Sequence, residues 1–449
     1  MHDSHDHVRS GRASAGPEGV LSAMTTIETP AGDVLDDLDW WTRPPAERDA
    51  LFARLRARRD RTFVTERGVN GDRRGCGFWA LTRYDEVREV SRRPQDFCSG
   101  EGINIFDEPE WLRRYRGSII AMDDPEHARM RRIVSRGFTP RALERLREDV
   151  LRTTREIIDS IAGRGECDFV TDVAALLPLR IVSDMMGIPR SQEQFIFDQT
   201  NILLGASDPE FVADQTPRGV ATAVLAACEA LVELLRELAE LRIAEPRDDL
   251  ITKLVAARDE ENLTPQELAA FFILLVGAGN ETTRNAIAHA LVALTHFPEQ
   301  RELWRSDVDR YTRPLVEEVL RWSSPVLHMR RTVTRDGVRL GDQEFAKGEK
   351  VVVWYRSANQ DERYFTDPTA FDITRDPNPH IAFGGPGPHF CLGANLARLE
   401  LSIALRELFS TLPDIRAAGE PEVLRSNFLN GIKHLRAEFT PVRRMYTSD

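Results

Sequence analysis

The apolar residues of this chain recur mostly with helical spacing, and only a few short runs have the β-branched and aromatic content of strands. Helices are predicted at 46–59, 125–137, 140–163, 171–187, 217–244, 248–258, 264–296, 312–322 and 393–411. Strands are predicted at 78–82, 329–334, 338–340 and 350–355. The pattern therefore predicts a mainly α-helical protein with a small β portion.

The longest predicted helix, 264–296, begins with a clear start signal. Thr264 and Glu267 have the spacing of a capping box, and Pro265 stands at the first helical position. With a rise of ~1.5 Å per residue, a helix of this length would cross the whole protein. Its most apolar part, 268–279, is too short to span a bilayer, so we expect a buried central helix and no membrane span.

An irregular segment rich in proline and glycine, 356–392, separates the last predicted strand from the last predicted helix. A loop of this length inside a compact protein is usually functional. No linker and no internal repeat divides the chain. We therefore expect a single domain over 24–449, preceded by a disordered tail over 1–23 that lacks the apolar core of a signal peptide.

Charge and cysteine content narrow the function classes. A net charge of −12 argues against a nucleic-acid-binding protein, which normally carries a basic surplus. The chain has no C-x-x-C pair, which argues against a disulfide framework or a structural zinc site and favours a reducing, cytoplasmic location. The cysteines are Cys76, Cys98, Cys167, Cys228 and Cys391.

One cysteine stands in an unusual context, at the end of the irregular segment. Cys391 directly precedes a predicted helix, whose N-terminal dipole and unpaired N–H groups lower the pKa of a nearby thiol. Gly384, Gly385 and Gly387 allow the backbone to approach closely and turn its N–H groups toward the sulfur. Phe383 and Phe390 would help to exclude water. A shielded thiolate with backbone donors is typical of a proximal ligand of haem iron.

Two other interpretations of Cys391 remain open at this point. A lone cysteine is commonly a small buried apolar side chain. Cys391 could also be a nucleophile with His389 as its base, although no third residue that would orient the base is evident.

The centre of the long helix carries polar residues within an otherwise apolar stretch. Gly277 and Gly279 weaken the helix there, and the Thr282 hydroxyl can hydrogen-bond to a carbonyl one turn back. The acid Glu281 beside this hydroxyl indicates proton delivery in a notch large enough for a small ligand. The alternative is a glycine-tolerant packing site with one solvated acid.

These segments together resemble the signatures of the cytochrome P-450 monooxygenases. The loop HIAFGGPGPHFCLG, 380–393, resembles the haem-binding loop of the family, with Gly387 four residues before Cys391 and Gly393 two after it. Phe383 departs from the pattern, because it lies eight residues before the cysteine where the family has its phenylalanine seven before. Residues 278–283, AGNETT, resemble the oxygen-activation motif. The resemblance covers residues 34–440.

The resemblance implies the fold, the cofactor and the reaction. It implies a cytochrome P450 fold, a large helical bundle with a long central helix, and haem b with Cys391 as its iron ligand. The reaction would insert one oxygen atom of O2 into a C–H bond, with Thr282 and Glu281 delivering protons.

Electrons would come from a ferredoxin and its reductase, because the chain contains no flavin or nicotinamide module. Arg129, Arg132 and Arg136 are candidates for a basic docking face. We expect a monomer.

Basic residues at matching positions would hold the haem propionates. His127 and Arg131, four residues apart, share one helix face and resemble the His-x-x-x-Arg pair of the family. Arg331 matches a propionate-binding arginine, with Arg330 the less favoured neighbour, and His389 would be a further partner.

A second charged group would be structural. Glu318 and Arg321 fit the E-x-x-R motif of the family, and by resemblance Arg375 completes a network with them. Its role would be to hold the shape of the protein around the cysteine.

The substrate is expected to be hydrophobic and lipid-like. The resemblance is strongest to an actinobacterial group that hydroxylates terminal methyls of sterol side chains or methyl-branched lipids. Alternatives are a terpenoid or polyketide hydroxylase and, from other classes, a non-catalytic haem-thiolate sensor or a cysteine hydrolase. The expected pocket residues are Ile103, Ile105, Phe106, Trp111, Leu275, Ala278, Val326, Leu327 and Phe428.

Overall fold

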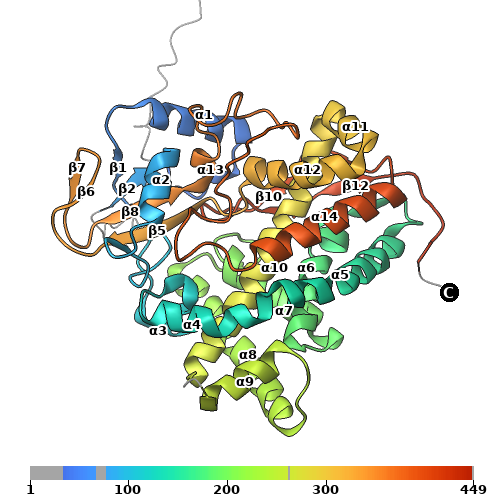
Figure 1. Cartoon of the computed structure of the whole chain (residues 1–449), viewed down its shortest axis with the longest axis horizontal. Helices are drawn as coiled ribbons and strands as arrows, with labels where there is room; N and C mark the ends of the chain where they lie inside the picture. Colours follow the sequence, from blue (N-terminus) through green and yellow to red (C-terminus); the bar gives the residue numbers. More distant parts are fainter. Residues whose placement is uncertain (1–33, 67–76, 261–262, 447–449) are drawn as a thin grey trace, which may run out of the picture.

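The computed structural model describes residues 34–66, 77–260 and 263–446. The predicted tail, 1–23, lies outside the described residues. The chain has a β-rich side and a larger helical side, and helix α10 (Pro265–His296) runs through the middle of the molecule (Figure 1).

The β-rich side is built on a five-stranded sheet of order β1-β2-β8-β5-β3. Its strands are β1 (Thr62–Val64), β2 (Phe78–Leu81), β3 (Phe97–Cys98), β5 (His328–Val333) and β8 (Lys350–Trp354). Strands β2 and β8 are parallel, and the other pairs are antiparallel. Helices α1 (Pro45–Ala57) and α2 (Tyr84–Ser91) both contact the short α13 (Tyr355–Ala358). Trp41 and Trp354 stack in the core here, with ring centroids 5.2 Å apart.

Helix α10 organises the helical side. The predicted capping box is confirmed: Glu267 N donates to Thr264 Oγ1 at 3.2 Å, and Thr264 N donates to the Glu267 carboxylate at 2.9 Å. Most side chains between 268 and 294 are buried. The helices that contact α10 are α3 (Glu110–Arg116), α6 (Leu176–Met186), α7 (Glu193–Gly205), α8 (Pro217–Ala244), α11 (Pro298–Ser306), α12 (Val308–Ser323) and α14 (Ala394–Thr411).

The remaining elements complete the outer layers. The other helices are α4 (Glu126–Val134), α5 (Pro140–Ile161) and α9 (Leu250–Glu260). Strand β12 (Arg436–Glu438) pairs with β4 (Glu166–Asp168) and β9 (Arg416–Ala417). Two hairpin-like pairs are β6 (Val338–Leu340) with β7 (Gln343–Phe345), and β10 (Glu422–Val423) with β11 (Ile432–His434). No helix among the described residues is long and apolar enough to cross a membrane.

The structure contains helices that the sequence pattern did not predict, namely α2, α3, α7, α11 and α13. Four of them, α2, α3, α11 and α13, have nine residues or fewer, and helices of this length owe most of their stability to tertiary packing and little to local propensity. Helix α7, with 13 residues, was missed although it is as long as α1. Helix α12 begins at Val308 and not at 312, because Asp307 caps it by accepting from Arg310 N at 3.0 Å. Pro314 lies inside this helix.

Candidate active site

The cysteine loop runs between α13 and α14 and turns back on itself at Cys391. Cys391 N donates to Phe383 O at 3.0 Å, and Phe390 N donates to Gly387 O at 3.1 Å. Gly384 has a φ of 87°, in the left-handed region that favours glycine. These bonds place the cysteine at the start of α14.

The loop packs against α2, a helix that the sequence did not predict. A Cβ at Gly387 would lie 2.0 Å from Ser91 O, and one at Gly385 would lie 2.5 Å from Ser91 Oγ. These glycines are therefore required for close packing. The backbone N–H groups that act on the Cys391 sulfur belong to Gly393 and Ala394. The prediction that Gly384, Gly385 and Gly387 turn N–H groups to the sulfur was thus wrong.

The predicted lowering of the Cys391 pKa was also wrong. Burial raises the pKa of the thiol, and it outweighs the opposing N–H groups of Gly393 and Ala394 and the charges of Arg131 and Arg398. The side chain is nevertheless accessible. A thiol that is both accessible and desolvated lies in a recess of the protein, where a cationic metal would favour the thiolate.

Phe383 shields this recess from one side. Its ring lies 6.3 Å from the ring of Phe390, and the Arg398 guanidinium carbon is 4.6 Å from the Phe383 centroid. The one-residue departure from the family pattern leaves Phe383 O bonded to Cys391 N. Phe390 is 40% exposed and therefore contributes less to the exclusion of water than the sequence suggested.

Four basic side chains converge next to the cysteine loop, as predicted for the propionate partners. The rings of His127 and His389 lie 4.3 Å apart, and Arg131 Nη2 donates to Phe390 O at 2.7 Å. Arg331 Nη1 donates to Arg330 O at 2.7 Å. Helix α4, strand β5 and the cysteine loop thus bring together residues that are far apart in the sequence.

Little negative charge faces this cluster, in which His127 Nδ1 lies 3.5 Å from Asp124 Oδ1. Burial lowers the pKa of His389 to about 3, and the positive charge of Arg331 adds to that effect; His127 and Arg131 act in the same direction. The buried His127 Nε2 has no hydrogen-bond partner among the described residues. Within the described part of the chain, no carboxylate forms an ion pair with Arg131 or Arg331. Such a cluster fits two carboxylates, and the donor set as a whole fits haem.

Arg330 has a different partner, because its Nη1 donates to Asp107 Oδ1 at 2.6 Å. Arg331 is therefore the arginine of the two that is available to an anion. His389 Nε2 lies 3.1 Å from Ser99 Oγ and among cations. This placement, together with a pKa lowered to about 3 by burial and by the neighbouring cations, makes His389 a weak base for a nucleophilic Cys391.

The Glu318–Arg321 pair is fully buried, with side-chain exposures of 0% for both residues. Two parallel hydrogen bonds of 2.7 and 2.8 Å join the guanidinium to the carboxylate. Arg321 also donates to the carbonyls of Asn359, Pro368 and Ala370. Arg375 Nε lies 3.4 Å from Glu318 Oε2. The structure therefore brings Arg375 to the E-x-x-R pair, where it helps to fix the start of the cysteine loop.

A second charged network was missed from the sequence. Glu317 accepts from Arg398 at 2.7 and 2.9 Å and contacts His380 Nε2 at 2.8 Å. Although burial alone raises the pKa of Glu317, these bonds lower it to about 2. The network ties α12 to the cysteine loop and α14. The sequence signal for this network was weak. It consisted only of the positions of Glu317, directly before the E-x-x-R glutamate, and of Arg398, shortly after Cys391.

The centre of α10 presents an accessible stripe on an otherwise buried helix. Leu275, Ala278 and Thr282 share one face, and each keeps accessible surface while Val276, Gly277 and Asn280 are buried. Thr282 Oγ1 donates to Ala278 O at 2.8 Å, as the sequence suggested. The helix remains continuous through this point.

Glu281 lies about a quarter of a turn around the helix from this stripe, on the buried side, and is 1% exposed. It forms an ion pair with Arg284. Burial raises the pKa of Glu281, and the Arg284 guanidinium opposes that shift. The structure thus contradicts the alternative of a solvated acid.

The predicted pocket residues fall into two groups. Ile103, Trp111, Val326 and Phe428 are partly accessible, and Phe106 is 49% exposed. Ile105 and Leu327, at 3% and 0%, lie instead in the sheet-side core around Trp41 and Trp354. These two side chains have little or no surface to offer a substrate. The residues left to line a cavity are Ile103, Phe106, Trp111, Leu275, Ala278, Val326 and Phe428.

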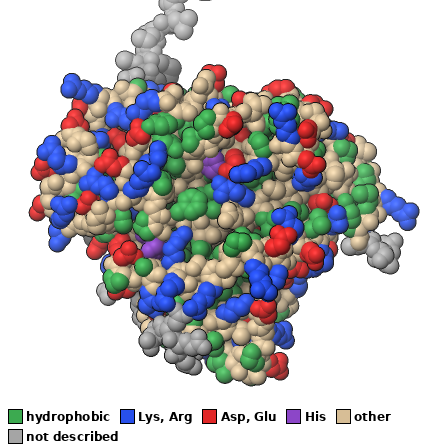
Figure 2. Space-filling view, in the orientation of Figure 1, with side chains coloured by type: hydrophobic (Ala, Val, Ile, Leu, Met, Phe, Trp, Pro, Cys, Tyr) green, Lys and Arg blue, Asp and Glu red, His purple; other side chains and the backbone are tan. Residues whose placement is uncertain are grey.

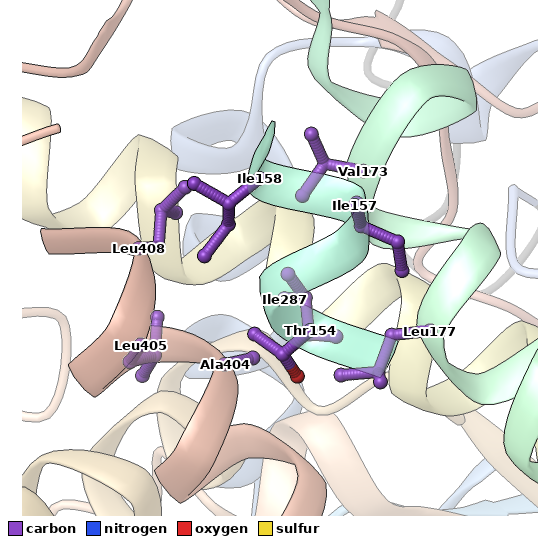
Figure 3. Close-up of a pocket in the computed structure, with 9 residues that line it drawn as sticks. All are labelled: Thr154, Ile157, Ile158, Val173, Leu177, Ile287, Ala404, Leu405 and Leu408. Atoms are coloured by element: carbon purple, nitrogen blue, oxygen red, sulfur yellow. The ribbon is translucent and has the colours of Figure 1, made fainter. Parts of the chain in front are cut away.

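A separate apolar pocket lies between α5, α6, α10 and α14 and contains none of the predicted site residues (Figure 3). The hydroxyl of Thr154, its one polar side-chain group, donates to Val150 O at 2.7 Å. The pocket is therefore part of the packing of the core. Its lining residues are Thr154, Ile157, Ile158, Val173, Leu177, Ile287, Ala404, Leu405 and Leu408.

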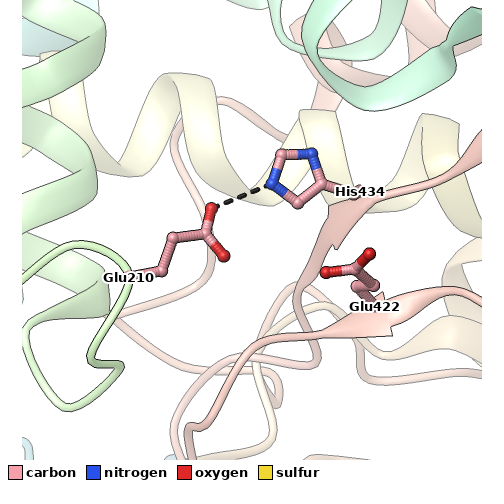
Figure 4. A group of neighbouring side chains, drawn as sticks. All are labelled: Glu210, Glu422 and His434. Carbon is pink, nitrogen blue, oxygen red and sulfur yellow. Dashed lines mark hydrogen bonds and ion pairs between the residues drawn. The ribbon is translucent and has the colours of Figure 1, made fainter.

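Glu210, Glu422 and His434 form a cluster with metal-ligand chemistry at the surface (Figure 4). His434 uses both ring nitrogens on carboxylates, Nδ1 to Asp168 at 2.5 Å and Nε2 to Glu210 at 2.9 Å. Lys433 Nζ lies 2.6 Å from Glu210 Oε2. With these nitrogens and charges already satisfied, the cluster is an ion-pair clamp between the α7–α8 loop and β11.

The clamp predicts a pH-dependent stability. Partial burial alone would lower the pKa of His434, but the neighbouring carboxylates of Asp168 and Glu210 raise it. The clamp should therefore stabilise the fold fully below the unfolded pKa of about 6.5, and lose this effect as pH rises through the raised folded value. In denaturant unfolding, His434→Gln should cost more stability at pH 6 than well above neutrality. An equal cost at both pH values would contradict this assignment.

Comparison with known proteins agrees with the site. Residues 74–412 match the family described as Cytochrome P450. A methyl-branched lipid omega-hydroxylase of Mycobacterium tuberculosis is 45% identical over 413 residues, which cover 91% of this chain and 95% of that protein. A steroid C26-monooxygenase of Mycolicibacterium smegmatis is 38% identical over 426 residues, covering 93% and 96%.

A solved structure of a Mycobacterium marinum cytochrome P450 in complex with pseudoionone superposes with a TM-score of 0.85. It is 37% identical and covers 92% of this chain and 100% of that chain. A Bacillus megaterium structure in complex with testosterone superposes with a TM-score of 0.78 at 31% identity, covering 90% and 99%.

A cysteine at a helix N-terminus, beside cations suited to two carboxylates, is typical of a haem-binding site with a sulfur iron ligand. The family match over most of the chain identifies the particular class. The chain belongs to the cytochrome P450 family and is a monooxygenase with the fold of that family. Membership implies a haem-iron cofactor, O2 as a substrate and a redox partner that supplies electrons.

Proposed function

We propose that this enzyme hydroxylates a hydrophobic, lipid-like molecule at a terminal methyl group, that of a methyl-branched fatty acid or of a sterol side chain. The observation that carries the proposal is the 45% identity, over 91% of the chain, to a methyl-branched lipid omega-hydroxylase. The similarity to a steroid C26-monooxygenase supports the same class of site.

The residues of the recess have distinct roles in this proposal. Haem b, when bound, supplies the activation of O2 and the oxidation of an unreactive C–H bond. Cys391 ligates the iron, while Phe383 and the protein around it limit water. His127, Arg131, Arg331 and His389 bind the propionates and orient the macrocycle.

The accessible stripe of α10 forms the other wall of the site in the proposal. Leu275 and Ala278 offer apolar surface to the substrate, and the Thr282 hydroxyl holds a proton at Oγ1. Glu281, one residue earlier, replaces that proton from the buried side of the helix. Trp111 on α3 and Phe428 near β10 would bound the substrate from neighbouring elements.

Thr282→Ala tests the proton relay. Without the hydroxyl, product formed per NAD(P)H consumed should fall at least about tenfold, a conservative share of the ~10²–10⁴-fold typical of acid–base catalysis. Peroxide release should rise in step. Thr282→Ser keeps the hydroxyl and should restore coupling. Unchanged coupling in the alanine variant would remove Thr282 from the mechanism.

Substrate class is tested by spectral titration of the ferric protein. Methyl-branched fatty acids would be compared with linear acids of the same carbon number, and sterols with and without a side chain with each other. Tighter binding of the branched acid or of the sterol with a side chain would support the proposal. Mass spectrometry of the product should then place the hydroxyl group on a terminal methyl. Conversion of pseudoionone or a polyketide alone would favour the secondary-metabolism alternative.

The electron donor is proposed to be a ferredoxin with its reductase, acting on a cytoplasmic monomer. Arg132 and Arg136, on and just after α4, are exposed and suit an acidic partner. Lys and Arg side chains are numerous on this face of the molecule (Figure 2). Arg129 forms an ion pair with Glu267 and is less available for docking than the sequence suggested.

A further inference from the structure

A buried polar cluster lies at the centre of α10, behind the accessible stripe. Asn280, Glu281 and Arg284 of α10 are 0, 1 and 3% exposed, and Asn201 of α7 is 7% exposed. Burying an ion pair is unfavourable unless the geometry and the remaining hydrogen bonds compensate for lost hydration. The contacts of this cluster therefore define what holds Glu281 in place.

Arg284 bridges Glu281 and helix α7. One end of its guanidinium donates to the Glu281 carboxylate, and Nη1 donates to Asn201 Oδ1 at 2.9 Å. Its guanidinium carbon lies 5.8 Å from the ring centroid of Phe197, four residues before Asn201 on the same helix. A displacement of α7 would therefore move the cation that faces Glu281.

Several polar atoms of the cluster are buried and have no hydrogen-bond partner among the described residues. They are Glu281 Oε1, Arg284 Nε and both amide atoms of Asn280. Buried polar groups are normally satisfied, so a concentration of such atoms next to Thr282 indicates a hydrogen-bonded path that they complete with water.

We propose that Arg284 is a positioning residue for Glu281, and that Asn201 couples this position to helix α7. This inference rests on the proposed proton relay through Glu281 and Thr282. In each cycle the Glu281 carboxylate accepts a proton from the buried path and releases this proton toward Thr282. Glu281 is then a carboxylate again.

The physical reason is a balance of two opposing effects on Glu281. Burial favours the neutral acid, and the Arg284 charge favours the carboxylate. Within the described residues, Arg284 is the charged group that acts on Glu281. The residues of α7 that contact Arg284, Asn201 and Phe197, are uncharged. Without Arg284 the acid would hold its proton more tightly.

Infrared spectroscopy of the ferric holoprotein tests this without turnover. The carbonyl band of protonated Glu281 is identified by its loss in Glu281→Gln, and its midpoint is followed over pH. Arg284→Met should raise the midpoint by about 1–3 pH units, the usual effect of losing a nearby opposite charge. Arg284→Lys should bring it back toward the wild-type value. An unchanged midpoint in Arg284→Met would overturn the proposal.

Asn201→Ala tests the link to α7 and keeps both charges, so it also serves if Arg284→Met fails to fold. It should shift the same midpoint upward, whereas Gln194→Ala, an exposed amide on α7, should not. A midpoint equal to that of wild type in Asn201→Ala would overturn the coupling to α7. An unchanged ratio of product to NAD(P)H consumed in Thr282→Ala would instead refute the relay. The infrared shifts would still report on the effect of Arg284 on Glu281.

Discussion

Replacement of Cys391 by alanine is expected to abolish monooxygenase activity, with a loss well beyond 100-fold. Loss of even an outer partner of a metal ligand costs about 10–100-fold in metal affinity or activity, and Cys391 is the proposed ligand itself. The side chain is accessible in its recess, and no other cysteine among the described residues lies at a helix N-terminus. The remaining donors of the site are basic groups suited to carboxylates.

The measurement is the spectrum of the reduced, CO-treated protein together with turnover. Wild type should show the Soret band at the position typical of thiolate ligation, and Cys391→Ala should lose it. Cys98→Ala is the matched control, because Cys98 is a free, partly accessible cysteine on strand β3. A variant that kept both the thiolate band and turnover would show that another residue ligates the iron.

Removal of one partner of the Glu318–Arg321 pair should destabilise the fold by about 3–5 kcal/mol. Both side chains are completely buried, so the residue left behind would be an uncompensated charge. Arg321→Met would in addition leave the carbonyls of Pro368 and Ala370 without their donor. Arg321→Lys should also be strongly destabilising, since one ammonium cannot reproduce the planar fork of the guanidinium.

Denaturant unfolding, followed by far-ultraviolet circular dichroism, measures this effect. The matched control is the Glu233–Arg236 pair on α8, which has the same residue types and spacing but side-chain exposures of 56% and 57%. Glu233→Gln should leave the free energy of unfolding unchanged. A cost below about 1 kcal/mol for Arg321→Met, the range of exposed ion pairs, would contradict the structural role of the network.

Local sequence was sufficient where the relevant interactions are short in range. The capping box of α10 and the Thr282 hydrogen bond join residues within one turn, so their spacing alone predicted them. The Glu318–Arg321 pair also has helical spacing. The short helix α2, in contrast, was not predicted, because it is stabilised by packing against α13 and β8.

The same limit explains the errors around the cysteine. Sequence gave no means to weigh the burial of Cys391 against its helix N-terminus, and burial proved the stronger effect on the thiol pKa. The role of Gly385 and Gly387 could not be seen either, since it depends on Ser91, which lies far away in the sequence.

The sequence by itself was sufficient to predict the family, and it led to the proposals of Cys391 as ligand and of the acid–alcohol pair, because these are carried by residue types at fixed spacings. Only the tertiary structure decided how they are surrounded. It gathered His127, Arg131, Arg331 and His389 from three separate elements, and it buried Glu281 against Arg284. Burial and long-range charge depend on which distant segments meet, and no local pattern records that.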